Sequence, residues 1–230
     1  MKILALDTSG TNCSVSIIDE DKVIADFNLN TGLTHSQTLM PLIDSMCKFS
    51  EIDLKDIDVF ACSIGPGSFT GLRIGIATIK GFALSLNKKV IAVPTLVGLA
   101  YNITNFDGII CSVLDARNDN VYAALFKYED KPKMIENYIT DSVDTLIENL
   151  KSKNQKVLFV GDGATAFKEK FTEALQENAY FAPLHLNNQL STSIAKAALD
   201  KALLDEFDTC DTIMPMYLKK SQAEREAENI

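Results

Sequence analysis

The chain opens with a short apolar segment that runs into a polar turn, Ile3-Leu4-Ala5-Leu6-Asp7-Thr8-Ser9-Gly10-Thr11. An apolar run that ends in hydroxyl and glycine residues is typical of a β-strand followed by a tight turn. Two more strand-like segments follow, at Cys13–Asp19 and Lys22–Asn30. The start of the chain therefore predicts a meander of three strands.

The remainder of the first half alternates helices with strands. A helix is expected from Thr34, which can act as its N-cap, to about Phe49. The other expected elements are a strand at Asp58–Ile64, a helix at Phe69–Leu86, a strand at Val90–Val93 and a short helix after Pro94. Strands that alternate with helices in this way predict an α/β fold.

The second half, which begins near Gly108, repeats this order. Asp115 follows Asp7 by 108 residues, and each of the two is preceded by leucine and followed six residues later by the start of a strand. Strands are expected at Ile109–Asp115, Val121–Glu129, Met134–Thr140 and Val157–Val160, and helices at Ser142–Ser152, Thr165–Asn178 and Ser191–Phe207. The spacing favours a duplicated chain with lobes at residues 1–106 and 107–230, although any two α/β halves can be aligned loosely.

The composition is that of a globular protein that can form a sizeable core. Of the 230 residues, 47% are hydrophobic and 23% are charged, and the net charge is −9. A surface this acidic disfavours unaided binding to nucleic acid or to an anionic membrane. Five scattered cysteines are typical of reduced thiols in the cytoplasm, and neither a signal-peptide core nor an apolar run of membrane length is expected.

The turn Asp7-Thr8-Ser9-Gly10-Thr11 is a candidate phosphate site at the end of the first strand. Backbone N–H groups and an aspartate in such a turn can contact a phosphate and its metal ion. The alternative is a plain hairpin turn that uses the conformational freedom of Gly10. The turn alone does not decide between the two.

A glycine-rich run joins a buried strand to the next helix, Gly65-Pro66-Gly67-Ser68-Phe69-Thr70-Gly71-Leu72-Arg73. Glycines before a helix N-terminus can form an anion site, but this run is neither a Walker A loop nor a G-x-G-x-x-G fingerprint. A tight turn with Ser68 as the helix N-cap explains the same residues. Gly161-Asp162-Gly163-Ala164 can likewise hold a nucleotide or simply begin a helix.

Two helices of the first half carry more apolar surface than a surface helix needs. The helix after Ser68 is apolar nearly all round, and its interior glycines each cost about 1 kcal/mol relative to alanine, which indicates a packing reason. We expect a protein-binding surface formed by Ser36, Met40, Ile43, Cys47, Gly71, Ile74, Gly75, Thr78 and Phe82. The alternative is that the second half of the chain covers both helices.

The sequence offers no motif for catalysis or for a metal ion. His35 and His185 lie 150 residues apart, no cysteine pair has C-x-x-C spacing and no G-x-S-x-G elbow occurs. His35 precedes Ser36, but adjacent side chains on a helix point about 100° apart, which does not suit a base and its nucleophile. We therefore expect no catalytic residue and no metal ligand. The charged stretch Lys219–Glu228 predicts a solvated surface or a docking segment.

Taken together, these motifs resemble the TsaB (YeaZ-like) family of tRNA threonylcarbamoyladenosine biosynthesis proteins. The runs that carry the resemblance are Ile3 to Ser9, Leu33-Thr34-His35-Ser36, Gly65 to Gly75, Leu114-Asp115-Ala116-Arg117 and Val121-Tyr122. The resemblance covers most of the chain and is strongest over residues 1–125. The run from Gly65 to Arg73 is its most specific part.

The resemblance implies a duplicated actin/chaperone/sugar-kinase-like fold, with two lobes that each hold a mixed sheet flanked by helices. It implies a scaffold subunit, and not an enzyme, in the complex that attaches a threonylcarbamoyl group to the tRNA adenosine next to the anticodon. The implied partners are the catalytic paralogue TsaD, bound through helices of the first lobe, and the ATPase TsaE, with tRNA reached only through the complex. A cytoplasmic location, no membrane contact and a homodimer in the absence of TsaD are also expected.

The second-lobe turn Asp115-Ala116-Arg117-Asn118-Asp119-Asn120 departs from nucleotide-binding members of this fold because it has no glycine. Without glycine a backbone cannot approach a phosphate so closely. No tightly bound cofactor is therefore expected, nucleotide binding is expected to be weak at most, and Asp7 to Thr11 becomes a vestigial phosphate turn. The alternative is an ATP-dependent small-molecule kinase-like enzyme with Asp7, Ser9 and Thr11 in its active site. A peptidase is disfavoured because no nucleophile–base pair is found.

Overall fold

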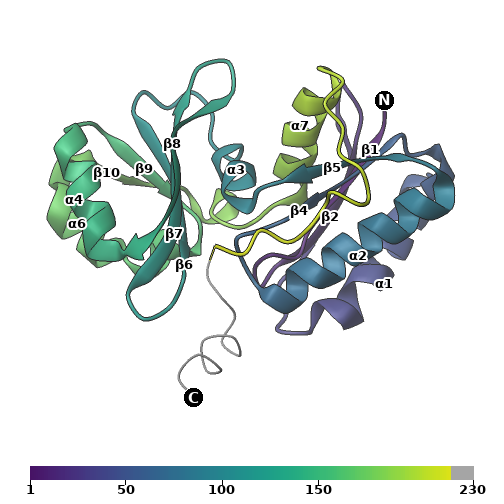
Figure 1. The fold of residues 1–230 in the computed structure, drawn as a ribbon, viewed down its shortest axis with the longest axis horizontal. Coiled ribbons are helices and arrows are strands. Elements are labelled where there is room, and N and C mark those ends of the chain that lie inside the picture. Colours follow the sequence, from purple (N-terminus) through teal and green to yellow (C-terminus); the bar gives the residue numbers. More distant parts are fainter. Residues whose placement is uncertain (219–230) are drawn as a thin grey trace.

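The first lobe is built on a five-stranded sheet with the order β3-β2-β1-β4-β5 (Figure 1). The structure is a computed structural model that describes residues 1–218, so the charged stretch Lys219–Glu228 lies outside the described residues. The strands are β1 Ile3–Asp7, β2 Cys13–Ile18, β3 Val23–Leu29, β4 Val59–Ser63 and β5 Lys89–Val93. β1 to β3 form the antiparallel meander predicted from the sequence, and β4 and β5 run parallel to β1.

The second lobe repeats this topology in a sheet with the order β10-β9-β6-β7-β8. Its strands are β6 Ile109–Asp115, β7 Asn120–Tyr128, β8 Pro132–Ser142, β9 Val157–Val160 and β10 Ala179–Phe181. β6 to β8 are antiparallel neighbours, and β9 is parallel to both β6 and β10. The same strand order and directions in both lobes confirm the duplicated fold.

Helices begin and end close to the expected residues where local signals are strong. The helices are α1 His35–Ser50, α2 Phe69–Leu86, α3 Thr95–Ala100, α4 Val143–Lys153, α5 Asp162–Ala166, α6 Lys168–Leu175 and α7 Ser191–Ala202, and the 3₁₀ turns are η1 Leu54–Asp56, η2 Gln176–Asn178 and η3 Leu184–Leu186. The Ser68 side chain accepts a hydrogen bond from the Gly71 N–H and caps α2. The single helix expected at Thr165–Asn178 is wrong, because the chain breaks at Phe167 and again after Leu175.

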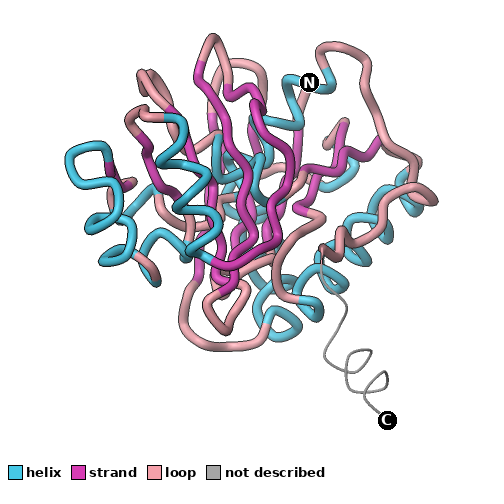
Figure 2. Tube along the Cα trace, turned by 60° about the vertical axis from the view of Figure 1, so that its left-hand side comes forward, coloured by secondary structure: helices cyan, strands magenta, loops and turns pink. Residues whose placement is uncertain are grey.

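Helices separate and cover the two sheets in layers. α1 and α2 pack on the outer face of the first sheet, and α4 and α6 pack on the outer face of the second. α7 packs on the inner face of the first sheet, and α3 packs on α7 and on the second sheet. Figure 1 shows α3 and α7 between the sheets, and Figure 2 shows cyan helices on the left beside the long strands of the second sheet. Both faces of each sheet are therefore covered at its centre, which explains the almost continuous apolar sequences of β1, β4, β6 and β9.

Two helices pack across the boundary that we predicted between residues 106 and 107. α7 belongs to the second half of the chain, but its residues Ile194 and Ala198 form a buried cluster with Ile3 and Val59 of the first sheet. α3, from the first half, packs Leu96 on the second sheet. The strands divide at the boundary, whereas these two helices exchange lobes.

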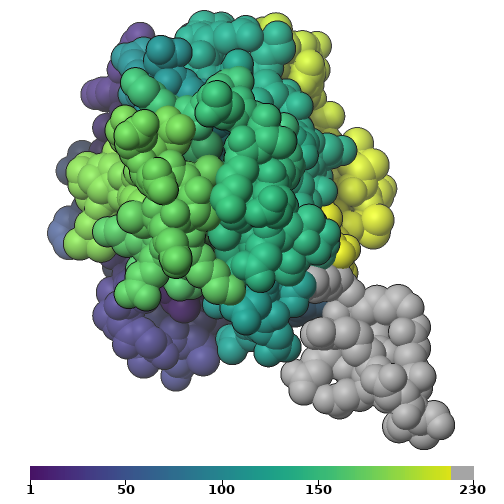
Figure 3. Space-filling view, turned by 90° about the vertical axis from the view of Figure 1, so that its left-hand side faces the viewer, coloured from purple at the N-terminus to yellow at the C-terminus, as the bar shows by residue number. Residues whose placement is uncertain are grey.

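The last described residues form a strap across the first lobe, the C-terminal strap (residues 208–217). It begins at the edge of β5, where the Asp208 N–H donates to the Val90 carbonyl at 2.9 Å. Ile213 is 2% exposed in the outer core, and the Met216 N–H donates to the Ile64 carbonyl at 2.7 Å. The strap is the last part of the yellow trace in Figure 1, and in Figure 3 the yellow residues show at the right-hand edge of the view, behind the second lobe. It closes the exposed edge of β5 and reaches the start of α2.

Helix α2 corrects one expectation from the sequence. By length and composition it could cross a membrane, contrary to the expectation that no run reaches that length. Here it packs along β4 with Leu72, Ile76 and Ile79 buried, as the core helix of a lobe does. One such helix is weak support for a membrane protein.

Candidate functional site

The polar groups of the turn after β1 hydrogen-bond to one another. Asp7 is 1% exposed, and its Oδ1 accepts hydrogen bonds from the Ser9 N–H at 2.8 Å and from the Ser9 hydroxyl at 2.6 Å. Burial raises the pKa of Asp7, and the hydrogen bonds from Ser9 and the nearby His35 oppose that rise. Oδ1 of Asp7 is thus engaged within its own turn, and its carboxyl group does not face solvent.

The glycine-rich run before α2 lies directly against this turn. The Ser68 N–H donates to the Ser9 carbonyl at 2.7 Å, and a Cβ added to Gly67 would overlap that carbonyl. From the second half of the chain, the buried Gln189 side chain covers Gly10, so a Cβ at Gly10 would lie 2.7 Å from its Oε1. The glycines here allow close contact between protein segments.

The corresponding turn of the second lobe is left-handed. Arg117, Asn118 and Asp119 all have positive φ, at 63°, 54° and 56°. The Arg117 N–H donates to Asp115 Oδ1 at 2.7 Å, and the Ala116 N–H donates to the Asn120 carbonyl at 2.9 Å. Asn and Asp tolerate this conformation better than other residues with side chains, which is how the turn forms without glycine.

The two turns face each other across a cleft of about 480 Å³ between the lobes. It is lined by Ser9, Gly10, Thr11, Gly67, Ser68, Phe69, Leu114, Asp115, Ala116, Arg117, Tyr122, Asp162 and Gln189. Ser9, Gly10 and Thr11 of the predicted phosphate turn therefore reach the cleft, whereas Asp7 and Thr8 do not line it. Gln189 was missed because no local pattern distinguishes it from an ordinary loop residue.

The second-lobe wall of the cleft is acidic. Asp162 Oδ1 accepts a hydrogen bond from the Asp115 N–H at 3.0 Å, and burial raises the pKa of Asp162. Arg117 is the one arginine or lysine among the residues that line the cleft. Two carboxyl groups beside a single cation disfavour binding of a polyphosphate unless a metal ion accompanies it. Among residues 1–218, no three His, Cys, Asp or Glu side chains are grouped to hold such an ion.

The predicted protein-binding residues divide into an exposed and a buried set. Ser36 is exposed, Met40 is 50% exposed, and Cys47, Ile74, Thr78 and Phe82 are half-buried. Ile43 is buried in the outer core at 2% exposure. The first set leaves side-chain surface on α1 and α2 that the chain itself does not cover.

The expectation that Gly71 and Gly75 face a partner is wrong. Both glycines are buried, and a Cβ at either would overlap Thr8, at its carbonyl from Gly71 and at its hydroxyl from Gly75. From Gly75 the Leu6 Cδ1 would also lie only 2.9 Å away. The packing reason for these glycines is therefore the close approach of α2 to the end of β1.

An apolar groove of about 500 Å³ runs along α1. It is lined by Met40, Ile43, Asp44, Cys47, Lys48, Glu51, Ile52, Asp53 and Leu54. Three predicted interface residues, Met40, Ile43 and Cys47, contribute to it. Nearby on the same helix, Phe49 is 82% exposed, although its ring stacks on Phe27 at 6.3 Å between centroids. Met40 lines the groove and Phe49 lies near it, so large apolar side chains remain exposed along α1.

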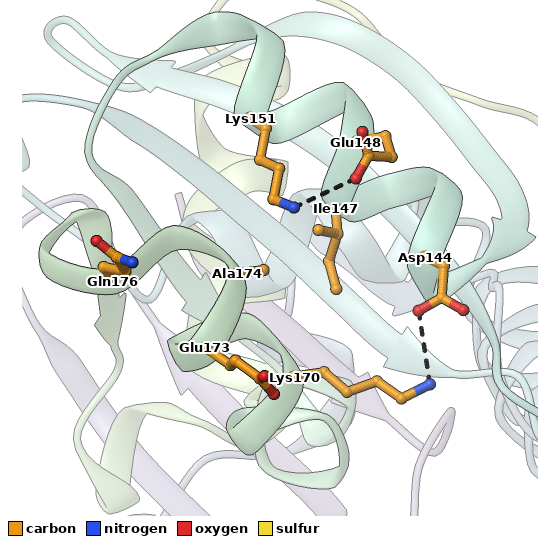
Figure 4. Close-up of a pocket in the computed structure, with 8 residues that line it drawn as sticks. All are labelled: Asp144, Ile147, Glu148, Lys151, Lys170, Glu173, Ala174 and Gln176. Atoms are coloured by element: carbon orange, nitrogen blue, oxygen red, sulfur yellow. Dashed lines mark hydrogen bonds and ion pairs between the residues drawn. The ribbon is translucent and has the colours of Figure 1, made fainter.

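A larger hollow, of about 590 Å³, lies between α4 and α6 on the second lobe (Figure 4). Both of its lysines are paired, since Lys151 lies 3.3 Å from Glu148 and Lys170 lies 3.6 Å from Asp144. None of the residues predicted to have a function lines it. This hollow is a solvated groove between two helices.

The fold and the inter-lobe cleft define the class of actin-like and sugar-kinase-like proteins. A hexokinase of the ROK type from Thermus thermophilus has a TM-score of 0.51 at 11% identity, over 87% of this chain and 99% of that chain. A Pseudomonas aeruginosa protein described as similar to the peptidase YEAZ has a TM-score of 0.82 at 24% identity, over 95% and 99% of the two chains. These likenesses establish the fold.

Sequence relatives establish the family. The TsaB protein of Bacillus subtilis, described as a tRNA threonylcarbamoyladenosine biosynthesis protein, is 31% identical over 227 residues, which is 97% of this chain and 96% of the relative. The family model of TsaD, tRNA N6-adenosine threonylcarbamoyltransferase, matches residues 30–227. The chain therefore belongs to the TsaB family of tRNA threonylcarbamoyladenosine biosynthesis proteins and is related to TsaD.

Proposed function

We propose that the chain is a non-catalytic scaffold subunit of the complex that attaches a threonylcarbamoyl group to tRNA. It pairs with a TsaD-like catalytic paralogue through α1 and α2. One observation carries this proposal: both helices expose a large apolar side chain, Met40 of α1 at 50% and Leu84 of α2 at 70%. Burying a large apolar side chain contributes about 1.5–3 kcal/mol, so a few such residues can sustain a specific contact.

The charges beside the groove support a partner with a basic rim. Three carboxylates, Asp44, Glu51 and Asp53, line the groove. Lys48 pairs with Asp44 at 2.7 Å and Lys55 pairs with Asp53 at 3.4 Å, which leaves Glu51 as the excess negative charge of the lining. Complementary charge raises the rate of association and favours one partner over others. A second copy of the chain carries the same acidic rim, so the homodimer expected in the absence of TsaD forms less readily than the complex.

The remaining roles follow from the same assignment. A TsaE-like ATPase joins the pair, and tRNA is bound through the complex because a net charge of −9 repels its phosphates. The complex works in the cytoplasm, without membrane contact. No cofactor is tightly bound, and nucleotide binding in the cleft is weak at most.

Met40→Asp tests the pairing surface, with Ile135→Asp as its matched control. Ile135 is an apolar residue of similar exposure, 44%, but it lies on β8 of the second lobe. Burying even an uncharged polar group without a partner costs about 1–3 kcal/mol, so a carboxylate at the interface is expected to weaken binding at least roughly five- to a hundredfold. The affinity of each variant for the TsaD-like protein of the same cell is measured by calorimetry. Equal affinities for the two variants would remove the α1 surface from the interface.

The kinase-like alternative has one supporting observation, the pair of carboxyl groups Asp115 and Asp162 in the cleft beside Ser9 and Thr11. It predicts steady ATP hydrolysis by the purified chain. Asp162→Asn keeps an oxygen that can accept the Asp115 N–H but removes the charge. If the wild-type chain hydrolyses ATP and this variant does not, the result would support the enzyme hypothesis and contradict the scaffold hypothesis. The scaffold predicts no turnover by either protein, and tRNA modification only when the TsaD-like subunit is present with this chain.

A further inference from the structure

We infer that the turn after β1 is a helix-positioning turn (residues 7–11), which fixes the starts of α1 and α2 and so sets the geometry of the pairing surface. The effect of this turn on partner binding rests on the proposed function, in which α1 and α2 form the pairing surface. The turn that the sequence offered as a phosphate site thus has a structural partner for three consecutive residues.

Each of these three residues makes one hydrogen bond to the start of a helix. The Thr8 hydroxyl donates to the Gly71 carbonyl in the first turn of α2 at 2.8 Å, and the Ser9 carbonyl accepts from the N–H of the α2 cap at 2.7 Å. The Gly10 carbonyl lies 2.9 Å from Nε2 of His35, the first residue of α1. A carbonyl can only accept, so His35 Nε2 carries the proton.

The turn and the backbone of α2 are in close contact. Side chains at Gly71 and Gly75 would overlap Thr8, so the α2 backbone rests directly on this residue. α1 and α2 each contact the sheet more extensively than they contact one another. Their relative position is therefore set through the sheet and the turn, and not by packing between the two helices.

Ser9 and Gly10 also have little left with which to hold a phosphate. The Ser9 N–H and hydroxyl both donate to Asp7, and the Gln189 side chain covers Gly10. A helix-positioning turn needs its hydrogen bonds to be made permanently, whereas a ligand site needs free donors. The observed hydrogen bonds are made within the protein, as a helix-positioning turn requires.

Thr8→Val tests the inference because valine keeps the shape of threonine and removes only the bond to Gly71. Restoring the start of α2 to its bound position then costs up to about one net hydrogen bond, so binding to the TsaD-like partner is expected to weaken by up to roughly fivefold. Thr8→Ser, which restores the hydroxyl, is expected to recover most of that loss. Thr95→Val is the matched control, because Thr95 is 1% exposed and its hydroxyl has no hydrogen-bond partner among the described residues.

Affinity is measured well below the melting temperature, where every variant is folded. A turn that only stabilises the fold would then leave affinity unchanged, since the folded fraction stays close to one. Unchanged affinity for Thr8→Val would therefore overturn the inference. So would an equal loss for Thr95→Val, because a buried hydroxyl without a partner positions nothing.

Amide hydrogen exchange of the free chain gives a second readout that needs no partner. Thr8→Val is expected to speed exchange in the first turns of α1 and α2 and to leave α4 unchanged. Uniform or unchanged exchange would overturn the inference even if the proposed function holds. If the wild-type chain does not bind the TsaD-like protein, the proposed function fails, and the exchange result still decides whether the turn positions the helices.

Discussion

Thr8 is the residue on which the start of α2 depends most directly. Its carbonyl and hydroxyl lie under two glycines, Gly71 and Gly75, at places where any side chain would overlap them. A third glycine of the same helix, Gly81, is exposed and has no atom within 4 Å of the position its Cβ would take. The same residue type therefore serves close packing at two positions of α2, and no packing within the chain at the third.

Gly75→Ala and Gly81→Ala are expected to change stability in opposite directions. At Gly75 the added methyl group overlaps Thr8, and overpacking of this kind costs about 1–3 kcal/mol. At Gly81 nothing is displaced, and replacing an exposed interior glycine by alanine stabilises a helix by up to about 1 kcal/mol. Chemical denaturation of both variants measures the difference. A stabilising Gly75→Ala would mean that α2 does not rest on Thr8 as described.

The pH dependence of stability tests the burial of Asp7. Its pKa is raised in the folded state, so folding favours the protonated form, and this contribution is lost as pH rises above the ordinary value of 3.8. Asp7→Asn can accept the same hydrogen bonds without a charge. The melting temperature of wild type relative to Asp7→Asn is therefore expected to fall as pH is raised from about 4 to 7. A constant difference between the two proteins would show that Asp7 is not desolvated.

Among the elements, the C-terminal strap ties α2 to the rest of the lobe. Tyr217 stacks on Phe69 at 4.4 Å between ring centroids, and its hydroxyl accepts a hydrogen bond from Arg73 Nε at 2.9 Å. Both partners lie in the first turns of α2. Four residues earlier, Ile213 completes the core between α2 and the sheet.

Ile213→Ala and Met214→Ala compare a buried strap residue with its exposed neighbour. Ile213 is 2% exposed and Met214 is 67% exposed. Truncating a buried isoleucine costs about 2–5 kcal/mol, whereas a surface substitution changes stability by about 0.5 kcal/mol at most. Thermal unfolding of the two variants provides the measurement. If Ile213→Ala is as mild as Met214→Ala, the strap is not part of the core.

Some features of these elements could be predicted from the sequence, and others could not. The repeated Leu6-Asp7 and Leu114-Asp115 spacing predicted the duplicated sheets because strands and turns depend on nearby residues. The periodicity of α2 predicted that the helix is apolar nearly all round, but it could not tell which neighbour Gly71 and Gly75 approach. Thr8 lies more than sixty residues away in the chain, and only the assembled sheet brings it to these glycines.

At the scale of the whole molecule, the exchange of α3 and α7 makes each lobe depend on the other half of the chain. The inner face of the first sheet, with Ile3, Val59 and Ile91, is covered by Ile194 and Ala198 of α7. Amphipathic patterns predicted that α7 has a buried face, but they carry no information about which sheet receives it. The exchange therefore could not be read from the sequence.

Residues 1–106 produced alone are expected not to form a stable lobe. Without α7 one whole face of the first sheet is exposed. Each large apolar side chain that loses its cover costs about 1.5–3 kcal/mol. The sum over several such residues exceeds the free energy of unfolding of a small domain. Circular dichroism and amide exchange of this fragment, with the full chain as reference, provide the measurement. A cooperative unfolding transition of the fragment would contradict the dependence.

The position of α7 and the strap, about a hundred residues after β5, has a consequence for biosynthesis. Translation adds about 5–20 residues per second, so the first sheet waits roughly 5–20 s between the synthesis of β5 and that of α7. Throughout that interval its inner face has no permanent cover, and the outer core lacks Ile213. A nascent or prematurely terminated chain cannot complete the lobe that carries α1 and α2. The fold thereby makes synthesis of α7 and the strap a condition for displaying the finished helical surface to another protein.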